Sequence, residues 1–254
     1  MSKDGLKKQV ISEFLASFLL GWLGLGAVVP LAVQGHIKDL FQFAWVFGLV
    51  IAFVVIIFNP ISGAQFNPGV TLALVLSGKQ DKKTLLPFWG AQVAGWGIGA
   101  GFAYITFWNQ LKEYFESGAG NPVALFFCHT DDIWSGVILE FAGTAFLVLA
   151  IFAMIDERCF NKPTNPLFPF MIALLIVYLI TFFAGYSGTA INSARDFGPR
   201  IIGLIYGLIN GYDVSPCFAD GQWILYLLTP LAGAVGGMLF FTKVVDKLLP
   251  PAKH

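Results

Sequence analysis

The chain has 254 residues, of which 57% are hydrophobic and only 12% are charged, and its formal net charge is zero. Soluble domains carry about 25% charged residues, so this composition predicts an integral membrane protein. The balanced charge argues against a nucleic-acid partner, and the cysteines lack the spacing of a metal site.

Apolar segments long enough to cross a bilayer, about 20 residues, recur along the chain. They cover residues 10–33, 40–58, 84–110, 133–155, 167–184 and 222–242. Two shorter apolar runs, 70–76 and 201–209, are too short to cross. The sequence therefore predicts an all-α membrane protein with six transmembrane helices and two re-entrant half-helices.

Each short run follows a Ser-Gly pair, three further residues and an asparagine. The first copy covers residues 62–71 (SGAQFNPGVT), and the second covers residues 187–196 (SGTAINSARD). Asparagine caps helix N-termini and proline suits the first turn, so Asn67 and Asn192 are expected to begin two half-helices. One half-helix in each half of a chain is typical of a binding or conduction site at the membrane midplane.

The two halves of the chain repeat one another. Glu13 and Glu140 occupy equivalent places in their halves, at similar distances before the motif asparagines. Each half holds three full spans, an odd number, so the second half enters the membrane from the opposite side. We expect one channel domain over residues 1–254, made of inverted repeats 8–110 and 133–246.

Basic residues are concentrated in alternate loops. These segments carry Lys3, Lys7, Lys8, Lys79, Lys82, Lys83, Arg158, Lys162, Lys243, Lys247 and Lys253. By the positive-inside rule all of these segments are cytoplasmic, so both termini are expected inside. Cys128 and Cys217 then lie in outer loops, either as a disulfide or as two free thiols.

The half-helix starts predict the chemistry at the centre of the membrane. Asn67 and Asn192 can cap their own helices and direct an N–H into the lumen, where each helix N-terminus adds about half a positive charge. Such a centre donates to water and hydroxyl groups and disfavours hydronium and metal cations. No catalytic triad, metal cluster or paired catalytic carboxylate is visible, so we expect no enzyme, no metal and no cofactor.

Charged residues inside the apolar segments have two interpretations each. Glu13 and Glu140 could relay protons in a transporter, or they could accept hydrogen bonds from the non-helical backbone, which the repeat symmetry favours. Arg195 could hold a solute oxygen near the outer mouth and repel cations, or it could be a structural arginine at the rim. Asp196 could pair with another chain or neutralise a neighbour.

Together these residues resemble the major intrinsic proteins, the aquaporins and glycerol facilitators. The resemblance rests on Glu13, residues 62–64, Asn67, Pro68, Gln92, Glu140, residues 187–188, Asn192 and residues 194–199. The run Arg-Asp-Phe-Gly-Pro is similar to the glycerol-conducting branch. The resemblance implies a homotetramer in the lipid bilayer of the cell membrane (plasma or inner), with one pore per protomer.

Family spacing also implies an outer selectivity filter made of Phe47, Ile180, Thr189 and Arg195. Water-selective members usually carry histidine where this chain has Ile180. Phe47 and Ile180 offer apolar surface, while Thr189 and Arg195 offer hydrogen bonds, a combination that suits a small polyol.

The usual Asn-Pro-Ala motif is altered in both copies. The residues that follow the asparagines are Pro68, Gly69, Ser193 and Ala194. Ser193 lacks the fixed φ of proline but adds a hydroxyl, so we expect a persistent half-helix with a looser or more polar centre. Gln65 stands where histidine is frequent.

We therefore predict a passive transmembrane channel for small neutral solutes, chiefly glycerol-like polyols, and water, which excludes ions and protons. The alternatives are a water-selective pore, a channel for a small weak acid such as lactic acid, and a proton-coupled secondary transporter.

Overall fold

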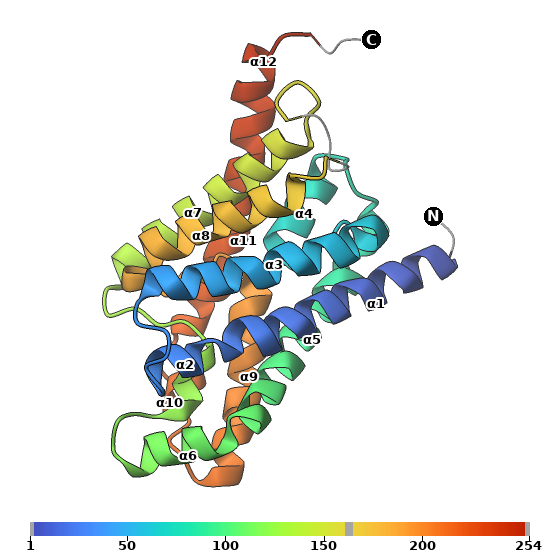
Figure 1. Ribbon diagram of the computed structural model, residues 1–254. Coiled ribbons are helices and arrows are strands. Elements are labelled where there is room, and N and C mark those ends of the chain that lie inside the picture. The colour runs from blue at the N-terminus through green and yellow to red at the C-terminus, as the bar shows by residue number, and fades with distance from the viewer. Residues whose placement is uncertain (1–2, 161–164, 252–254) are drawn as a thin grey trace.

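The structure of the chain is a computed structural model that describes residues 3–160 and 165–251 (Figure 1). Lys162 and Lys253, two of the basic residues used to predict the orientation, lie outside the described residues. Within the described ranges the regular elements are all helical.

The helices have these bounds in chain order: α1 (Lys3–Leu19), η1 (Leu20–Gly24), α2 (Val28–Ala32), α3 (Leu40–Ser62), α4 (Pro68–Leu76), η2 (Lys82–Thr84), α5 (Leu85–Thr106), α6 (Trp108–Glu116), η3 (Pro122–Phe126), α7 (Ile133–Ile155), α8 (Phe168–Ser187), α9 (Ser193–Asn210), α10 (Ser215–Phe218), α11 (Gln222–Phe240), η4 (Phe241–Val245) and α12 (Asp246–Leu248). The segments η1 and η4 are π-helical turns within longer helices, and η2 and η3 are 3₁₀ turns.

Five helical stretches in the described part of the chain are long and apolar enough to cross a membrane. They are Asp4–Ala32, Leu40–Ser62, Ile133–Ile155, Phe168–Ser187 and Ser215–Leu248. The remaining expected span corresponds to α5, which has 22 residues but is rich in glycine. Glycine lowers the hydropathy of α5 without shortening it.

The glycines of α5 allow close contact between helix backbones. A Cβ atom at Gly99 would lie 2.3 Å from the carbonyl oxygen of Phe18, and one at Gly95 would lie 2.5 Å from that of Phe14. Both carbonyls belong to α1, so α1 and α5 pack through small residues as membrane helices commonly do.

Two expected boundaries differ from the structure. The span expected at residues 84–110 ends at Thr106, and a separate helix, α6, follows it. This helix is amphipathic, because Leu111 is buried while its neighbours face outward. Helix α9 begins at Ser193, before the apolar run 201–209, because the Asn192 side chain caps it there.

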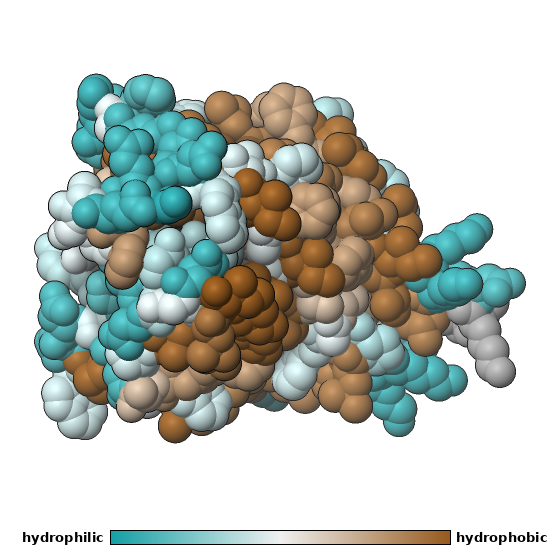
Figure 2. Space-filling view, turned by 90° about the horizontal axis from the view of Figure 1, so that it is seen from below, coloured by the Kyte–Doolittle hydropathy of each residue, from teal (hydrophilic) through white to brown (hydrophobic). Residues whose placement is uncertain are grey.

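The surface is arranged as a membrane protein requires. Figure 2 shows hydrophilic side chains gathered toward two opposite ends of the molecule, with a broad apolar area between them. Large apolar side chains are exposed on the described helices, including Phe53 (63%), Ile105 (69%) and Leu208 (66%). Contact with lipid removes the cost that such surface would carry in water.

The two half-helix motifs occupy corresponding positions in the bundle. Helices α3 and α8, which pack against each other, each end at a serine followed by a glycine with positive φ, Gly63 (87°) and Gly188 (74°). A short non-helical loop then leads into α4 and α9. The structure thus contains both capped helices that the sequence predicted.

Candidate functional site

Glu13 organises the loop that precedes α4. Its side chain is completely buried. One carboxylate oxygen accepts hydrogen bonds from Ser62 Oγ (2.6 Å) and Gln65 N (3.0 Å), and the other accepts from Phe66 N (2.7 Å) and Gln92 Nε2 (2.8 Å). These bonds satisfy loop N–H groups that have no helical partner.

Glu140 does the same for the loop that precedes α9, and it is also completely buried. It accepts hydrogen bonds from Ser187 Oγ (2.7 Å), Ala190 N (2.9 Å) and Ile191 N (2.6 Å). The oxygens of Glu13 and Glu140 are therefore occupied by backbone and side-chain donors of the two loops, which is the structural interpretation that the repeat symmetry favoured.

Both loops contain strained backbone. Four residues other than glycine have positive φ: Ala64 (46°), Phe66 (38°), Thr189 (53°) and Ile191 (42°). The left-handed region is unfavourable for β-branched residues such as Thr189 and Ile191, and such strain persists only where surrounding contacts impose it. The carboxylate hydrogen bonds of Glu13 and Glu140 impose it here.

Asn67 and Asn192 begin their helices as predicted. Asn67 Oδ1 accepts from Gly69 N (2.9 Å), and Asn192 Oδ1 accepts from Ala194 N (3.0 Å) and Arg195 N (3.2 Å). The amide nitrogen of each asparagine donates to the loop before the other half-helix, from Asn67 to the carbonyl oxygen of Ile191 and from Asn192 to that of Phe66. The sequence did not predict these contacts. Each amide has a second N–H, and both asparagines line the central cavity.

The residues that follow the asparagines pack behind the cavity and do not line it. Pro68 accepts a hydrogen bond from Trp89 Nε1 at its carbonyl (3.0 Å). A Cβ atom at Gly69 would lie 3.0 Å from Ala234 Cβ, so this replacement of the usual alanine gives α11 room. Ala194 is completely buried.

Ser193 does not make the pore centre more polar, and that expectation is wrong. Its hydroxyl is buried and donates to the carbonyl oxygen of Leu227 in α11 (2.7 Å). The half-helix persists without proline because the Asn192 cap and this contact fix its first turn.

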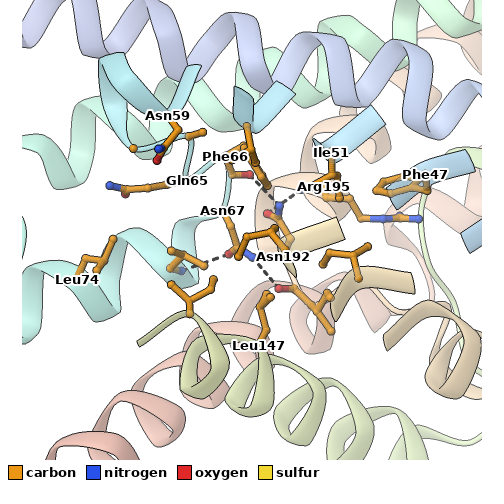
Figure 3. Close-up of a pocket in the computed structure, with 18 of the residues that line it drawn as sticks. Phe47, Ile51, Asn59, Gln65, Phe66, Asn67, Leu74, Leu147, Asn192 and Arg195 are labelled. Carbon is orange, nitrogen blue, oxygen red and sulfur yellow. Dashed lines mark hydrogen bonds between the residues drawn. The ribbon is translucent and has the colours of Figure 1, made fainter. Parts of the chain in front are cut away.

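A cavity of about 250 Å³ connects these features. Figure 3 shows Asn67 and Asn192 near its middle, Phe47 and Arg195 toward one end, and Asn59, Gln65 and Leu74 toward the other. The two loops supply polar lining. Aliphatic side chains from α3, α7 and α8 supply much of the apolar lining, including Ile51, Val55, Leu147, Ile151, Ile172, Ile176 and Ile180.

The four predicted filter residues all line this cavity. Phe47, Ile180 and Thr189 are each less than one-tenth exposed, and the Phe47 ring stacks on Trp96 with 6.5 Å between ring centroids. Among the described residues, the Arg195 side chain donates one hydrogen bond, from Nη1 to the Phe126 carbonyl oxygen at 3.5 Å, and buried Thr189 Oγ1 has no partner.

Sequence reasoning missed Arg200, which lies one helical turn after Asp196 and is completely buried. Asp196 neutralises this neighbour, with 2.6 Å between Arg200 Nε and Asp196 Oδ2, instead of pairing with another chain. The spacing of opposite charges by four residues was a signal for such a pair. Cys128 and Cys217 are buried free thiols, so the disulfide alternative is wrong.

The sequence profile described as "Major intrinsic protein" matches residues 1–241. The chain belongs to this family. Relatives include the propanediol uptake facilitator PduF of Citrobacter freundii, 30% identical over 97% of this chain and 95% of the relative. The glycerol uptake facilitator of Escherichia coli K12 is 32% identical over 96% of this chain and 90% of the relative.

The fold of a solved family member agrees. The X-ray structure of the aquaglyceroporin from Plasmodium falciparum matches with a TM-score of 0.85 and 25% identity, covering 96% of this chain and 98% of that chain. The predicted aquaporin-like fold is therefore confirmed. Family membership also confirms that the chain is a passive membrane channel and not an enzyme, and it does not favour the proton-coupled transporter.

Proposed function

We propose that this major intrinsic protein conducts small neutral polyols of glycerol size, together with water, and excludes ions and protons. The observation that carries the proposal is that Phe47, Ile180, Thr189 and Arg195, the four residues of the predicted outer constriction, line one cavity. A pore lined in this way is apolar over one part of its wall and hydrogen-bonding over another.

A three-carbon polyol has the same division, since its carbon chain is apolar and its hydroxyl groups are polar. The hydrocarbon can lie against Phe47 and Ile180. Thr189 Oγ1, which lacks a protein partner, can exchange a hydrogen bond with a hydroxyl, and the free donors of Arg195 can bind a hydroxyl oxygen. Because buried polar groups need partners, a solute that satisfies them replaces water without a large penalty.

The names of the relatives agree with this substrate class. One is described as a facilitator of propanediol uptake and another as a facilitator of glycerol uptake. Both solutes are neutral three-carbon compounds with at least two hydroxyl groups. We assign this chemical class, and no individual solute, to the chain.

Two positive features act against cations in the pore. Helices α4 and α9 begin at the central asparagines, and each helix N-terminus carries about half a positive charge. Arg195 adds a full charge near the outer constriction. A cation would meet all three charges inside a low-dielectric bundle, whereas a neutral polyol would not.

We further propose that residues 8–110 and 133–246 are inverted repeats. The support is the pairing of equivalent contacts, because Glu13 and Glu140 bind equivalent loops, and Asn67 and Asn192 cap equivalent helices. We also infer a homotetramer in the cell (plasma or inner) membrane with both termini cytoplasmic. The family and the placement of the basic residues support this setting.

Replacing Ile180 tests the assignment of the constriction. Ile180→His adds a polar ring that narrows the opening, while Ile180→Val keeps it apolar and serves as the matched control. In proteoliposomes, we expect Ile180→His to lower glycerol permeability about tenfold, a discrimination that small changes in pocket size can supply, and to retain water permeability. Equal glycerol permeability in both variants would contradict the assignment.

A further inference from the structure

The pair formed by Asp196 and Arg200 lies directly behind the outer constriction. Both side chains are buried, with exposed fractions of 1% and 0%. Both belong to α9, and Arg200 Nε donates to Asp196 Oδ2 at 2.6 Å. Since a buried ion pair often stabilises a fold no better than apolar residues of similar volume, its other contacts indicate what it does.

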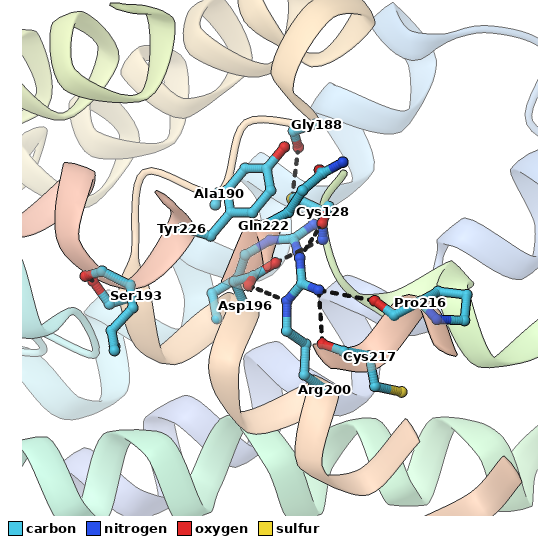
Figure 4. Close-up of polar contacts among 12 residues, drawn as sticks. Cys128, Gly188, Ala190, Ser193, Asp196, Arg200, Pro216, Cys217, Gln222 and Tyr226 are labelled. Carbon is cyan, nitrogen blue, oxygen red and sulfur yellow. Dashed lines mark hydrogen bonds and ion pairs between the residues drawn. The ribbon is translucent and has the colours of Figure 1, made fainter. Parts of the chain in front are cut away.

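The guanidinium of Arg200 binds the backbone of two outer segments (Figure 4). Nη1 donates to the carbonyl oxygens of Pro216 (3.1 Å) and Cys217 (3.0 Å), and Nη2 donates to the carbonyl oxygen of Cys128. The Phe127 ring centroid lies 4.4 Å from the guanidinium carbon. Only a planar fork of donors can make this set of bonds, so lysine is not equivalent here.

Asp196 binds the same outer segment through its other oxygen. Asp196 Oδ1 accepts a hydrogen bond from Cys128 N at 2.7 Å. The backbone N–H of Cys128 is therefore held by the carboxylate and its C=O by the guanidinium. The ion pair fixes this peptide segment from both directions.

The segment that the ion pair fixes contacts Arg195 and the residue that precedes Thr189, and Arg195 and Thr189 are the two hydrogen-bonding residues of the predicted constriction. Two residues before Cys128, the carbonyl oxygen of Phe126 accepts the hydrogen bond of Arg195. The Cys128 thiol donates to the carbonyl oxygen of Gly188 at 3.3 Å, and Gly188 directly precedes the strained Thr189. The segment that contains Cys128 is therefore linked to Arg195 through Phe126 and to Thr189 through Gly188.

We propose that Asp196 and Arg200 are positioning residues for solute selectivity, which set the places of Arg195 and Thr189 through residues 126–128. The proposal rests on the proposed polyol function and extends it. Arg195 has a single, long side-chain hydrogen bond among the described residues, so its placement depends on the segment that accepts it. Movement of that segment changes the spacing between donors that a polyol must bridge.

The first test measures glycerol and water permeability of the full-length protein in proteoliposomes. Arg200→Lys and Asp196→Asn should lower the ratio of glycerol to water permeability about tenfold, since small misplacements of binding groups have effects of this size or larger. Thr84→Val is the control, because it removes a buried hydrogen bond to the Asp81 carbonyl (2.7 Å) far from the constriction. A purely structural role predicts lower thermal stability in all three variants with an unchanged ratio.

Two substitutions of Cys128 leave the ion pair intact. They test the proposal even if Arg200→Lys and Asp196→Asn do not fold. Cys128→Ala removes the donor to Gly188, and Cys128→Ser retains a donor. We expect the ratio to fall about two- to threefold in Cys128→Ala, the effect of one modest hydrogen bond, and to recover in Cys128→Ser. An unchanged ratio in Cys128→Ala would overturn the proposal. Absence of glycerol permeability in the unsubstituted protein would instead overturn the proposed function.

Discussion

Asn67 and Asn192 each donate a hydrogen bond to the carbonyl oxygen of the residue that precedes the other. Asn67 Nδ2 lies 2.9 Å from Ile191 O, and Asn192 Nδ2 lies 2.8 Å from Phe66 O. The two half-helices are thereby joined through the residues that cap them. One N–H of each amide is used in this way, and the second is free to face a passing solute.

The carboxylates of Glu13 and Glu140 should matter for folding and not for coupling to protons. Glu13→Gln puts an NH₂ group where a carboxylate oxygen accepts from loop N–H groups. Each donor left unpaired costs about 1–3 kcal/mol, so we expect a clear drop in melting temperature, with the same direction for Glu140→Gln. The measurements are thermal unfolding in detergent and solute uptake with and without a pH gradient.

Exposed Glu113 supplies the control, since Glu113→Gln should leave the melting temperature unchanged. Uptake that follows the pH gradient in the unsubstituted protein, and loses that dependence in Glu13→Gln, would instead favour a proton-coupled transporter.

Ser193 should contribute to stability without affecting conduction. Ser193→Ala removes the hydrogen bond to Leu227 and should cost about 0.5–1.5 kcal/mol. Ser193→Pro loses the same bond but fixes φ at the first helical position. The lower conformational entropy of its unfolded chain stabilises the fold by about 0.4–1 kcal/mol. Unfolding experiments should therefore rank Ser193→Pro between the alanine variant and the natural chain. A loss of solute flux in either folded variant would show that the hydroxyl acts in the pore.

Glycines of α5 should differ sharply in their tolerance of alanine. A Cβ atom at Gly99 would lie 2.3 Å from a backbone oxygen of α1, whereas one at Gly101 meets its nearest atom at 3.4 Å. We expect Gly99→Ala to destabilise the protein by more than about 2 kcal/mol, as overpacking does, and Gly101→Ala to be close to neutral. Thermal unfolding of the two variants compares them directly, and equal stability would contradict the described packing of α1 on α5.

Asp156, which directly follows α7, should give a pH-dependent contribution to the stability of the fold. Its hydrogen bond from Arg158 lowers the pKa of the Asp156 carboxyl to about 2, and Arg158 also binds Asp246 in α12. Because the pKa is lowered in the folded state, the carboxylate stabilises the fold above its ordinary pKa of 3.8, and this contribution is lost as the pH falls toward 2.

The measurement is the difference in melting temperature between the natural chain and Asp156→Asn. We expect this difference to be constant between about pH 8 and about pH 5 and to shrink as the pH falls from there toward 2. Asp131→Asn, at an exposed position in the loop before α7, controls for general acid effects. A difference that grows with acidification would refute the assigned role of Asp156.

Much of the fold was predictable because it depends on local patterns. The paired motifs placed both capped helices, and the matched positions of Glu13 and Glu140 indicated acceptors for the loops. Contacts between distant segments were not predictable. The partner of Ser193 is on α11, and the guanidinium of Arg200 binds residues 128 and 216–217. No local pattern specifies which carbonyl lies beside which donor.

Stopped-flow light scattering of proteoliposomes in a glycerol gradient tests directly whether the pore conducts polyols. We predict glycerol entry far faster than into protein-free liposomes, together with rapid water flux and no proton conductance. Rapid water flux with glycerol entry no faster than into protein-free liposomes would contradict the assignment to polyols. Slow glycerol entry with lactic acid entry that increases as the pH falls would assign the pore to a neutral weak acid.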